Sequence, residues 1–315
     1  MSALLLAVLL AQDEKVVRVG LVGLDTSHVI AFTDLLNNPK NANHVPGARV
    51  IAAYKGGSAD FKASYERVDG FTKQISEKYG IEIVDTIEAL AAKVDAVLLE
   101  SVDGRIHLEQ ARSIFAARKR VFIDKPLSAS LKDAKEIVRL SRESGTPFFS
   151  ASSQRFSEAV KQLKEDPELG PLLGCAVHSA VSGAPQHPDF SFYGIHGIEA
   201  IFALMGPGWE SLRRADVDVV AARWKDGRVA TYRGLRKGAS SFGATAYGEK
   251  AVKSTAPGKG SGYAPLVREI VKFFQTGVSP VSPEEMLEVI AFIEAADLSK
   301  ANGGQDVKLA ELLAK

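Results

Sequence analysis

The chain has 315 residues, which is longer than a typical single domain and suits two domains. It is 46% apolar and 24% charged, like an ordinary globular protein, and its 39 Lys and Arg balance 38 Asp and Glu. This neutral balance argues against a general binder of nucleic acids or other polyanions, which needs a basic surplus. The single cysteine, Cys175, excludes an internal disulfide and a metal site built on several thiolates.

Residues 3–11, ALLLAVLLA, form a continuous apolar run that is too short to span a bilayer. The run resembles the apolar part of an export signal with cleavage after Ala11, although no Lys or Arg precedes it and Leu9 occupies a place where a small residue is preferred. A mis-assigned or truncated start is the alternative. We therefore exclude residues 1–14 from the fold and expect the protein to be either exported, to the periplasm or cell exterior, or cytoplasmic.

The expected fold opens at residue 16. Branched apolar residues from Val17 to Val22 indicate a buried strand, which Gly23 breaks, and an amphipathic helix is expected from about residue 29. A strand, a glycine turn and a helix open a mononucleotide-binding unit, in which free N–H groups and the positive end of the helix dipole face a phosphate.

The glycine fingerprint of such a unit is incomplete. The standard pattern is Gly-x-Gly-x-x-Gly, and this chain has only Gly23, with Asp25 and His28 in the other two places. Asp25 would repel a pyrophosphate unless it caps the helix, as Asp commonly does. Thr26 and Ser27 could donate hydroxyl hydrogen bonds to a phosphate. We expect dinucleotide binding at this turn, with an altered or lost pocket as the alternative.

Strands and helices alternate from this turn to residue 151. The strands expected next are 48–54, 81–84, 94–99, 121–123 and 147–151, with helices in 59–79, 87–93, 107–117 and 128–145. The alternation predicts a Rossmann-type, doubly wound parallel sheet over residues 15–151, covered by helices on both faces. Because such sheets bind ligands at the carboxyl ends of their strands, we expect one shared rim formed by Asp25, Lys55, Ser101–Arg105 and Asp124–Pro126.

The residue after the second strand reports on the cofactor's ribose. An Asp or Glu there would accept from a 2′-hydroxyl and repel a 2′-phosphate, whereas Lys55 does the reverse. The position therefore favours NADP over NAD modestly, unless Lys55 is simply a solvated residue at the end of the strand.

The pattern changes at residue 152. Residues 173–181, 217–224, 228–233 and 241–247 alternate apolar and polar side chains like antiparallel strands, and helices are expected in 197–205, 264–275 and 283–302. Lys225-Asp226-Gly227 is a strong hairpin signal. Residues 152–315 are thus predicted to form an α+β substrate and oligomerisation domain with an open, mostly antiparallel sheet. An open sheet needs its free face covered, so a homodimer or homotetramer is expected.

Six segments resemble one known family in the family's own order. They are VRVGLVG (17–23), VDAVLLESVDGRIHLEQA (94–111), VFIDKPLS (121–128), SSQRF (152–156), GIHGIEAIFALMG (194–206) and SPVSPEEMLEVIAFIEAADLS (279–299). The chain thereby resembles a divergent member of the glucose–fructose oxidoreductase / inositol dehydrogenase / rhizopine-catabolism (Gfo/Idh/MocA) family over nearly everything after residue 15. Asp124 stands where the family's Glu-Lys-Pro segment has its Glu.

The resemblance implies a nicotinamide dinucleotide, NADP or NAD, in the first domain and a sugar, cyclitol or sugar-derived substrate against the sheet of the second. It implies that Lys125 helps the substrate proton leave as hydride transfers, and that His196 relays this proton as a neutral imidazole. Burial at the end of a strand can lower the pKa of Lys125 toward working pH. The alternatives are a lysine paired with Asp124 or a neighbouring acid, and a structural histidine at a helix end.

The site residues expected from position and resemblance fall into two groups. Those expected at the cofactor are Gly23, Asp25, Thr26, Ser27, His28, Lys55, Ser101, His107, Asp124, Lys125 and Pro126. Those expected at the substrate are Lys125, Arg155, His187, Tyr193 and His196. His107 could instead only start its helix, and Arg155 could instead form a structural ion pair.

The chain departs from the family before His196. The family often has an Asp four residues earlier, where this chain has Phe192, so one member of the acid–base pair is absent. Asp189, Tyr193, His187 or Glu199 could replace it. The six histidines include no i, i+4 pair and no His-Glu-x-x-His motif, so no metal site is expected.

Three functions follow from these observations. The first is an NAD(P)-dependent oxidoreductase acting on a secondary alcohol of a carbohydrate-like small molecule, with neither nucleic acid nor a membrane span as a partner. The second is an enzyme that cleaves a glycosidic bond by transient oxidation with a permanently bound nicotinamide. The third is a non-catalytic sugar-binding or regulatory protein on the same fold, motivated by Phe192 and the incomplete fingerprint.

Overall fold

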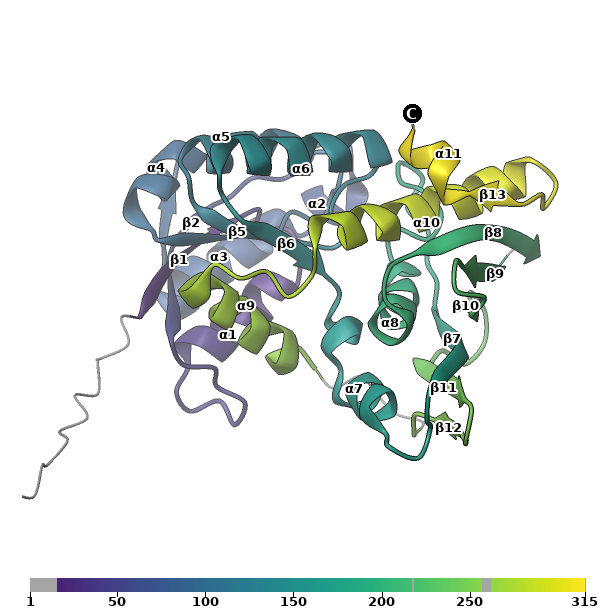
Figure 1. The fold of residues 1–315 in the computed structure, drawn as a ribbon. Helices are drawn as coiled ribbons and strands as arrows, with labels where there is room; N and C mark the ends of the chain where they lie inside the picture. Colours follow the sequence, from purple (N-terminus) through teal and green to yellow (C-terminus); the bar gives the residue numbers. More distant parts are fainter. Residues whose placement is uncertain (1–15, 217, 257–261, 315) are drawn as a thin grey trace, which may run out of the picture.

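The computed structural model describes residues 16–216, 218–256 and 262–314. Its first sheet has six parallel strands in the order β3-β2-β1-β4-β5-β6, which is the Rossmann order (Figure 1). The strands are β1 (Val17–Val22), β2 (Ala48–Tyr54), β3 (Glu82–Val84), β4 (Ala96–Leu99), β5 (Arg120–Asp124) and β6 (Phe148–Ala151). The predicted fold class is confirmed, while the predicted export signal in 1–14 lies outside the described residues.

Helices cover both faces of this sheet. Those of the first half of the chain are α1 (His28–Asn37), α2 (Lys62–Tyr65), α3 (Val68–Tyr79), α4 (Ile87–Lys93), α5 (His107–Ala116) and α6 (Leu131–Ser144). Figure 1 shows α4, α5 and α6 on one face and α1 and α3 on the other. Local chemistry sets several ends: the Ser130 hydroxyl accepts from the N–H of Asp133 at the start of α6, and Gly145 ends it in a left-handed conformation.

The second sheet has seven strands in the order β12-β11-β7-β10-β9-β8-β13. They are β7 (Leu172–Ala180), β8 (Trp209–Asp216), β9 (Val219–Trp224), β10 (Val229–Leu235), β11 (Gly243–Gly248), β12 (Val252–Ser254) and β13 (Val307–Lys308). The pairing is antiparallel except between β7 and β10, so the sheet is mostly antiparallel as predicted. Gly227, with φ +91°, makes the expected turn between β9 and β10.

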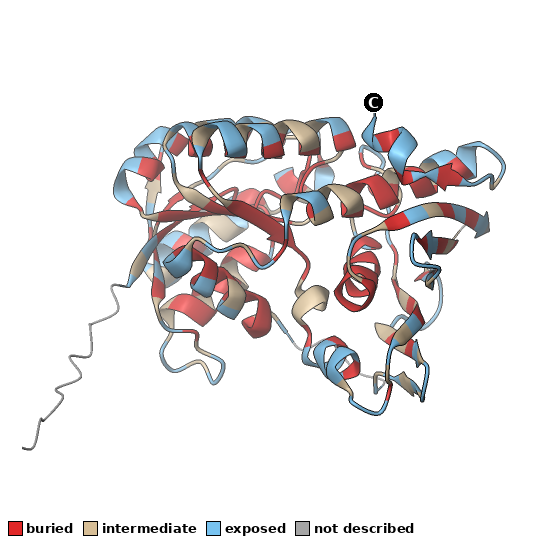
Figure 2. Ribbon diagram, in the orientation of Figure 1, coloured by how far each residue is buried: buried red, intermediate tan, exposed pale blue. Residues whose placement is uncertain are grey.

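The remaining helices join the two sheets. They are a 3₁₀ turn (Ser153–Phe156), α7 (Glu158–Glu165), α8 (Ile195–Met205), α9 (Ala264–Thr276), α10 (Pro283–Ala301) and α11 (Leu309–Leu313). Helix α8 packs on β7, β10 and β11 and is buried along nearly its whole length (Figure 2). Helix α9 returns to β1 and β5, and α10 bridges α6 and β8. Helices α9 and α10 therefore pack against elements of the first sheet, and α10 also packs against the second sheet. Among the helices of the described segments, none is both long and apolar enough to cross a membrane.

Strand β8 was absent from the sequence prediction, and its packing explains why. Trp209 and Leu212 point into the core, but the next inward position is Arg214, whose charge hides the apolar alternation. The guanidinium of Arg214 pairs with Asp189 at 2.6 Å and Asp297 at 3.1 Å. These partners come from distant parts of the chain, so no local pattern announces that the arginine is buried.

Candidate active site

Three neighbouring strands end at one rim of the first sheet. Because β1, β4 and β5 are adjacent and parallel, their carboxyl ends bring together Gly23–Ser27, Glu100–Asp103 and Asp124–Pro126. The backbone N–H of Val102 donates to the Asp25 carboxylate at 2.8 Å, which joins the first two of these segments directly. The rim that the sequence predicted is therefore formed.

Gly23 allows the turns to approach each other closely. Its φ is +85°, and a Cβ there would lie 2.1 Å from the Ser101 hydroxyl oxygen. The N–H of Gly23 donates to the carbonyl of Tyr54 at 3.0 Å, so the end of β2 also packs on this turn. The Ser101 hydroxyl in turn donates to the side chain of Gln110 at 2.9 Å.

Asp25 does not cap helix α1. From the sequence, Asp25 was expected to repel a phosphate at this turn unless it capped the helix. The N-cap is the exposed Ser27, without a side-chain capping bond, and the buried Asp25 carboxylate accepts from Ser64 at 2.6 Å. Burial raises the pKa of Asp25 despite its hydrogen bonds to Ser64 and Val102. The Asp25 side chain is therefore occupied elsewhere. At the start of α1 the N–H of His28 donates to the Thr26 hydroxyl at 3.4 Å, and the N–H of Val29 donates to the Thr26 carbonyl at 3.4 Å.

His28 lies against the end of β5. Its Nδ1 is 2.7 Å from Asp124 Oδ2, and its ring stacks on Phe32 and meets the edge of Tyr263. Burial acts to raise the pKa of Asp124, but the charge and hydrogen bond of His28 outweigh it and lower that pKa. The alternative in which Asp124 pairs with Lys125 is not the arrangement observed, because no ion pair within 4.0 Å joins these two residues in the described part of the chain.

Lys125 projects from the rim toward the second domain, followed by a cis peptide bond to Pro126. Its Nζ lies 3.4 Å from the carbonyl oxygen of Phe192 and about 6 Å from the ring centres of Phe192 and Tyr193, at 5.7 and 5.9 Å. Burial lowers the pKa of Lys125, and the charges of Asp124 and Glu100 only partly oppose it. The amine is thus a poorly solvated group held at the boundary between the two domains.

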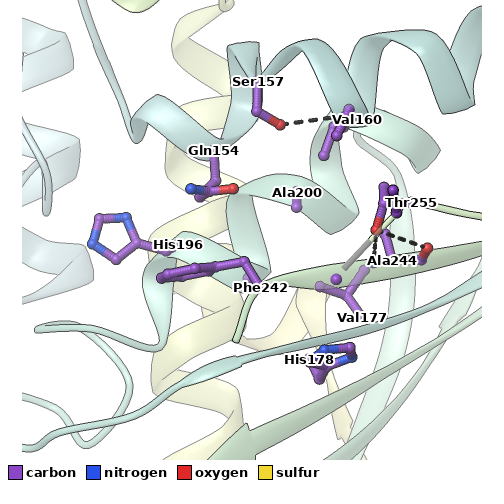
Figure 3. Close-up of a pocket in the computed structure, with 14 residues that line it drawn as sticks. Gln154, Ser157, Val160, Val177, His178, His196, Ala200, Phe242, Ala244 and Thr255 are labelled. Atoms are coloured by element: carbon purple, nitrogen blue, oxygen red, sulfur yellow. Dashed lines mark hydrogen bonds between the residues drawn. The ribbon is translucent and has the colours of Figure 1, made fainter. Parts of the chain in front are cut away.

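His196, near the start of α8, lies close to the same boundary. Its Nδ1 is 2.6 Å from the Ser152 hydroxyl, and its ring packs edge-on against Tyr193 and Phe242. Burial, with the charges of Lys125 and His28, lowers the pKa of His196 well below its usual value, so the ring is neutral at neutral pH. Figure 3 shows His196 and Phe242 on one side of a pocket of about 50 Å³ and Thr255 on the other.

Of the other predicted substrate residues, Tyr193 lies beside His196, whereas His187 and Arg155 are held by other partners. Tyr193 is exposed and its ring centre lies 5.6 Å from that of His196. His187 is buried, with Nε2 3.2 Å from both Asp103 Oδ1 and the backbone nitrogen of Gly104. Arg155 is enclosed by Glu199 and Glu285, which is the structural ion pair that the sequence left open.

The contacts of the four residues that could replace the family's Asp show which of them lies near both Lys125 and His196. Glu199 is held by Arg155, and Asp189 accepts from Arg214 at 2.6 Å and Arg236 at 2.7 Å. His187 contacts the loop after β4, as described above. Tyr193 is the candidate whose side chain contacts both His196 and Lys125.

Two predicted cofactor residues have other partners. The ring nitrogens of His107 lie 2.7 Å from the carbonyl oxygen of Ser101 and 3.2 Å from that of Leu127, so His107 ties the start of α5 to the rim. Lys55 is exposed and pairs with Asp69 at 2.6 Å on the surface.

Sequence reasoning missed Glu100, which follows the apolar run of β4. It is completely buried, and burial together with the charges of Asp124 and Asp25 raises its pKa well above the usual value. A charged residue at the end of a run such as VDAVLL was the available signal. One donor atom from each of His28, Glu100 and Asp124 lies within 4.8 Å of the others, an arrangement that histidine spacing alone did not indicate.

The fold and this rim combine a Rossmann-type parallel sheet with a second, mostly antiparallel sheet that helices cover. Residues 17–152 match the model of the oxidoreductase family described as having an NAD-binding Rossmann fold. Over this domain the chain matches the Gfo/Idh/MocA family, in agreement with the resemblance found in the sequence.

The relatives are distant. Myo-inositol 2-dehydrogenase from Thermotoga maritima is 30% identical over 128 residues, which cover 40% of this chain and 38% of that protein. The matched segment thus spans about two fifths of this curated relative. Scyllo-inositol dehydrogenase from Lactobacillus casei, solved with NAD(H) and scyllo-inositol, has a TM-score of 0.74 at 17% identity and covers 94% of this chain and 100% of its own. A probable dehydrogenase from Thermotoga maritima has a TM-score of 0.74 at 20% identity and covers 94% of this chain and 99% of its own.

Proposed function

We propose that the chain is an NAD(P)-dependent oxidoreductase that acts on a secondary alcohol of a sugar, cyclitol or sugar derivative. The observation that carries the proposal is that Lys125 and a neutral His196 both lie beside Tyr193, where the carboxyl rim of the first sheet meets α8. An amine and an imidazole on either side of a cofactor rim are suited to moving the hydroxyl proton that accompanies hydride transfer.

The rim fits the anionic part of a dinucleotide at the start of α1. The N-cap has no side-chain bond, Ser27 is exposed, and Asp25 turns its carboxylate to Ser64, away from that helix end. Thr26 and Ser27 would therefore hold phosphate oxygens by donating from their hydroxyls. When bound, the nicotinamide would supply the hydride acceptor or donor.

The proposed proton path uses the chain's own groups. Lys125 Nζ takes the proton from the substrate hydroxyl, or returns it in the reverse direction, while the carbonyl of Phe192 holds the amine. Ser152, at 2.6 Å from Nδ1, orients the neutral ring of His196 for a relay. We propose Tyr193, whose ring lies beside His196 and Lys125, as the residue that replaces the family's Asp.

The substrate class rests on the relatives. The two inositol dehydrogenases are named for cyclitols, whose ring carries several secondary alcohols. The 50 Å³ pocket beside His196 has polar groups of Gln154 and Thr255 in a lining that is otherwise largely apolar.

The test begins with the cofactor. Purified protein is denatured and searched for released nucleotide, and nucleotide-free protein is titrated with NADH and NADPH by fluorescence. Turnover is then measured on a panel of cyclitols and sugars for the wild type and for Lys125→Met, which should lose turnover far more than cofactor affinity. Unchanged turnover in Lys125→Met refutes the role of this lysine. Non-exchanging nucleotide would favour the glycoside-cleaving alternative, and sugar binding without nucleotide binding would favour the non-catalytic one.

A further inference from the structure

Three side chains of the first domain meet at the rim and form what we call the His28–Glu100–Asp124 cluster. One nitrogen or carboxylate oxygen from each lies within 4.8 Å of those of the other two. Their exposed fractions are 9%, 0% and 3%. They come from the first residue of α1, the residue after β4 and the last residue of β5, so the rigid sheet fixes their spacing.

The acids of this cluster have too few partners. Three buried oxygen atoms have no hydrogen-bond partner within the described segments. They are both carboxylate oxygens of Glu100 and Oδ1 of Asp124. Asp124 is served by His28 at Oδ2 and by the backbone N–H of Lys125. Buried carboxylates are normally paired, hydrogen-bonded or bound to a metal, because desolvation strongly disfavours an isolated charge.

Neighbouring charges do not satisfy the cluster. The Nζ of Lys125 contacts the Phe192 carbonyl, and no ion pair within 4.0 Å joins it to Glu100 or Asp124 in the described residues. The third nearby acid, Asp25, adds further negative potential, and its carboxylate is already bound to Ser64 and Val102. The unserved oxygens thus belong to buried acids that lie close together without a neutralising cation in contact among the described residues.

We propose that the His28–Glu100–Asp124 cluster binds one divalent first-row transition metal ion, of the class of Mn²⁺, Fe²⁺ or Zn²⁺. An imidazole nitrogen with two carboxylates is a donor set for these ions, whereas Mg²⁺ and Ca²⁺ prefer oxygen alone. Ligand bonds of about 2.0–2.2 Å place donors up to about 4.4 Å apart, so a separation of 4.8 Å or less closes with shifts of a few tenths of an ångström. Three protein ligands leave positions open for water or a ligand oxygen.

The site goes beyond the proposed redox function and does not depend on it. A divalent ion would offset the negative charge of Glu100 and Asp124 at the rim where an anionic cofactor is proposed to bind. The ion is expected whether or not nucleotide is present, so metal binding and nucleotide binding can be measured separately.

The experiment uses the full chain freed of nucleotide. Metal content is measured by plasma mass spectrometry after purification, and chelator-treated protein is titrated with Mn²⁺ and Zn²⁺ by calorimetry, with thermal unfolding followed in parallel. We expect one ion per chain and a higher Tm with metal. The isosteric Glu100→Gln should weaken binding about tenfold or more and lose the Tm increase. The control His44→Gln removes a histidine outside the site and should leave both unchanged.

The contrary outcomes are distinct. The proposal is overturned if the wild type binds neither ion. If Glu100→Gln is then folded and more stable than the wild type, Glu100 is a buried neutral acid. Binding that survives Glu100→Gln but is lost in His44→Gln is adventitious and also overturns it. If Glu100→Gln does not fold by circular dichroism, Asp124→Asn is tested against the same two criteria. Loss of metal with NADPH affinity retained leaves the proposed function intact.

Discussion

Replacing Arg155 with Met tests whether this residue supports the fold or the substrate. The Arg155 side chain is 7% exposed and lies between the carboxylates of Glu199, 5% exposed, and Glu285, 14% exposed. Removing the arginine leaves two buried acids without their cation, which costs about 3–5 kcal/mol in comparable pairs. Since about 1 kcal/mol shifts Tm by about 2–4 °C for domains of this size, Tm should fall by about 6–20 °C.

The loss should depend on pH in a defined direction. Burial already raises the pKa of Glu199, and Arg155 opposes that rise. Without Arg155 the pKa of Glu199 rises further in the folded protein. A raised pKa in the folded state makes the protein less stable as pH increases above the pKa that the carboxyl has in the unfolded chain. Arg155→Met should therefore be more destabilised at pH 8 than at pH 5, and adding Glu199→Gln should restore part of the loss.

The assay is urea unfolding of wild type and variants at both pH values, with activity measured on the same samples. Arg139→Met is the control, because Arg139 pairs with Glu136 and Glu143 on the surface and its removal should leave the midpoint nearly unchanged. A raised KM with wild-type stability in Arg155→Met would refute the structural role and return Arg155 to the substrate site.

Three further predictions concern the rim. Gly23→Ala should destabilise by about 2 kcal/mol or more, because of its φ of +85° and the contact with Ser101, whereas Gly70→Ala in open space on α3 should stabilise by about 0.5–1 kcal/mol in chemical unfolding. Burial acts to raise the pKa of Asp103, but its hydrogen bonds hold that pKa well below the usual range. The stability of the wild type should therefore fall as pH drops from 5 to 3. Thermal melts of Asp103→Asn should show a smaller fall over the same pH range. Lys55→Ala should weaken NADPH more than NADH in fluorescence titrations, and equal losses would contradict a 2′-phosphate role.

The sequence was sufficient to predict the first domain because its signals are local. Buried parallel strands read as apolar runs, and glycines or capping hydroxyls end the elements between them, so strand β2 was placed at Ala48–Tyr54 as observed. The rim followed from topology, since parallel strands with helical crossovers bring their carboxyl ends to one edge. The order of motifs also indicated the family that residues 17–152 match, without any contact being known.

The partners of the charged side chains were decided by the tertiary structure. Arg155 pairs with residues 44 and 130 positions away, and His28 with one 96 positions away. Arg214 hid strand β8 for the same reason, and Glu100 became part of a candidate metal cluster only where β1, β4 and β5 end together. A buried charge is stable only with a partner, and that partner is set by which strand ends become neighbours in space. Periodicity therefore determines which segments form the sheets, whereas folding decides which charge faces which.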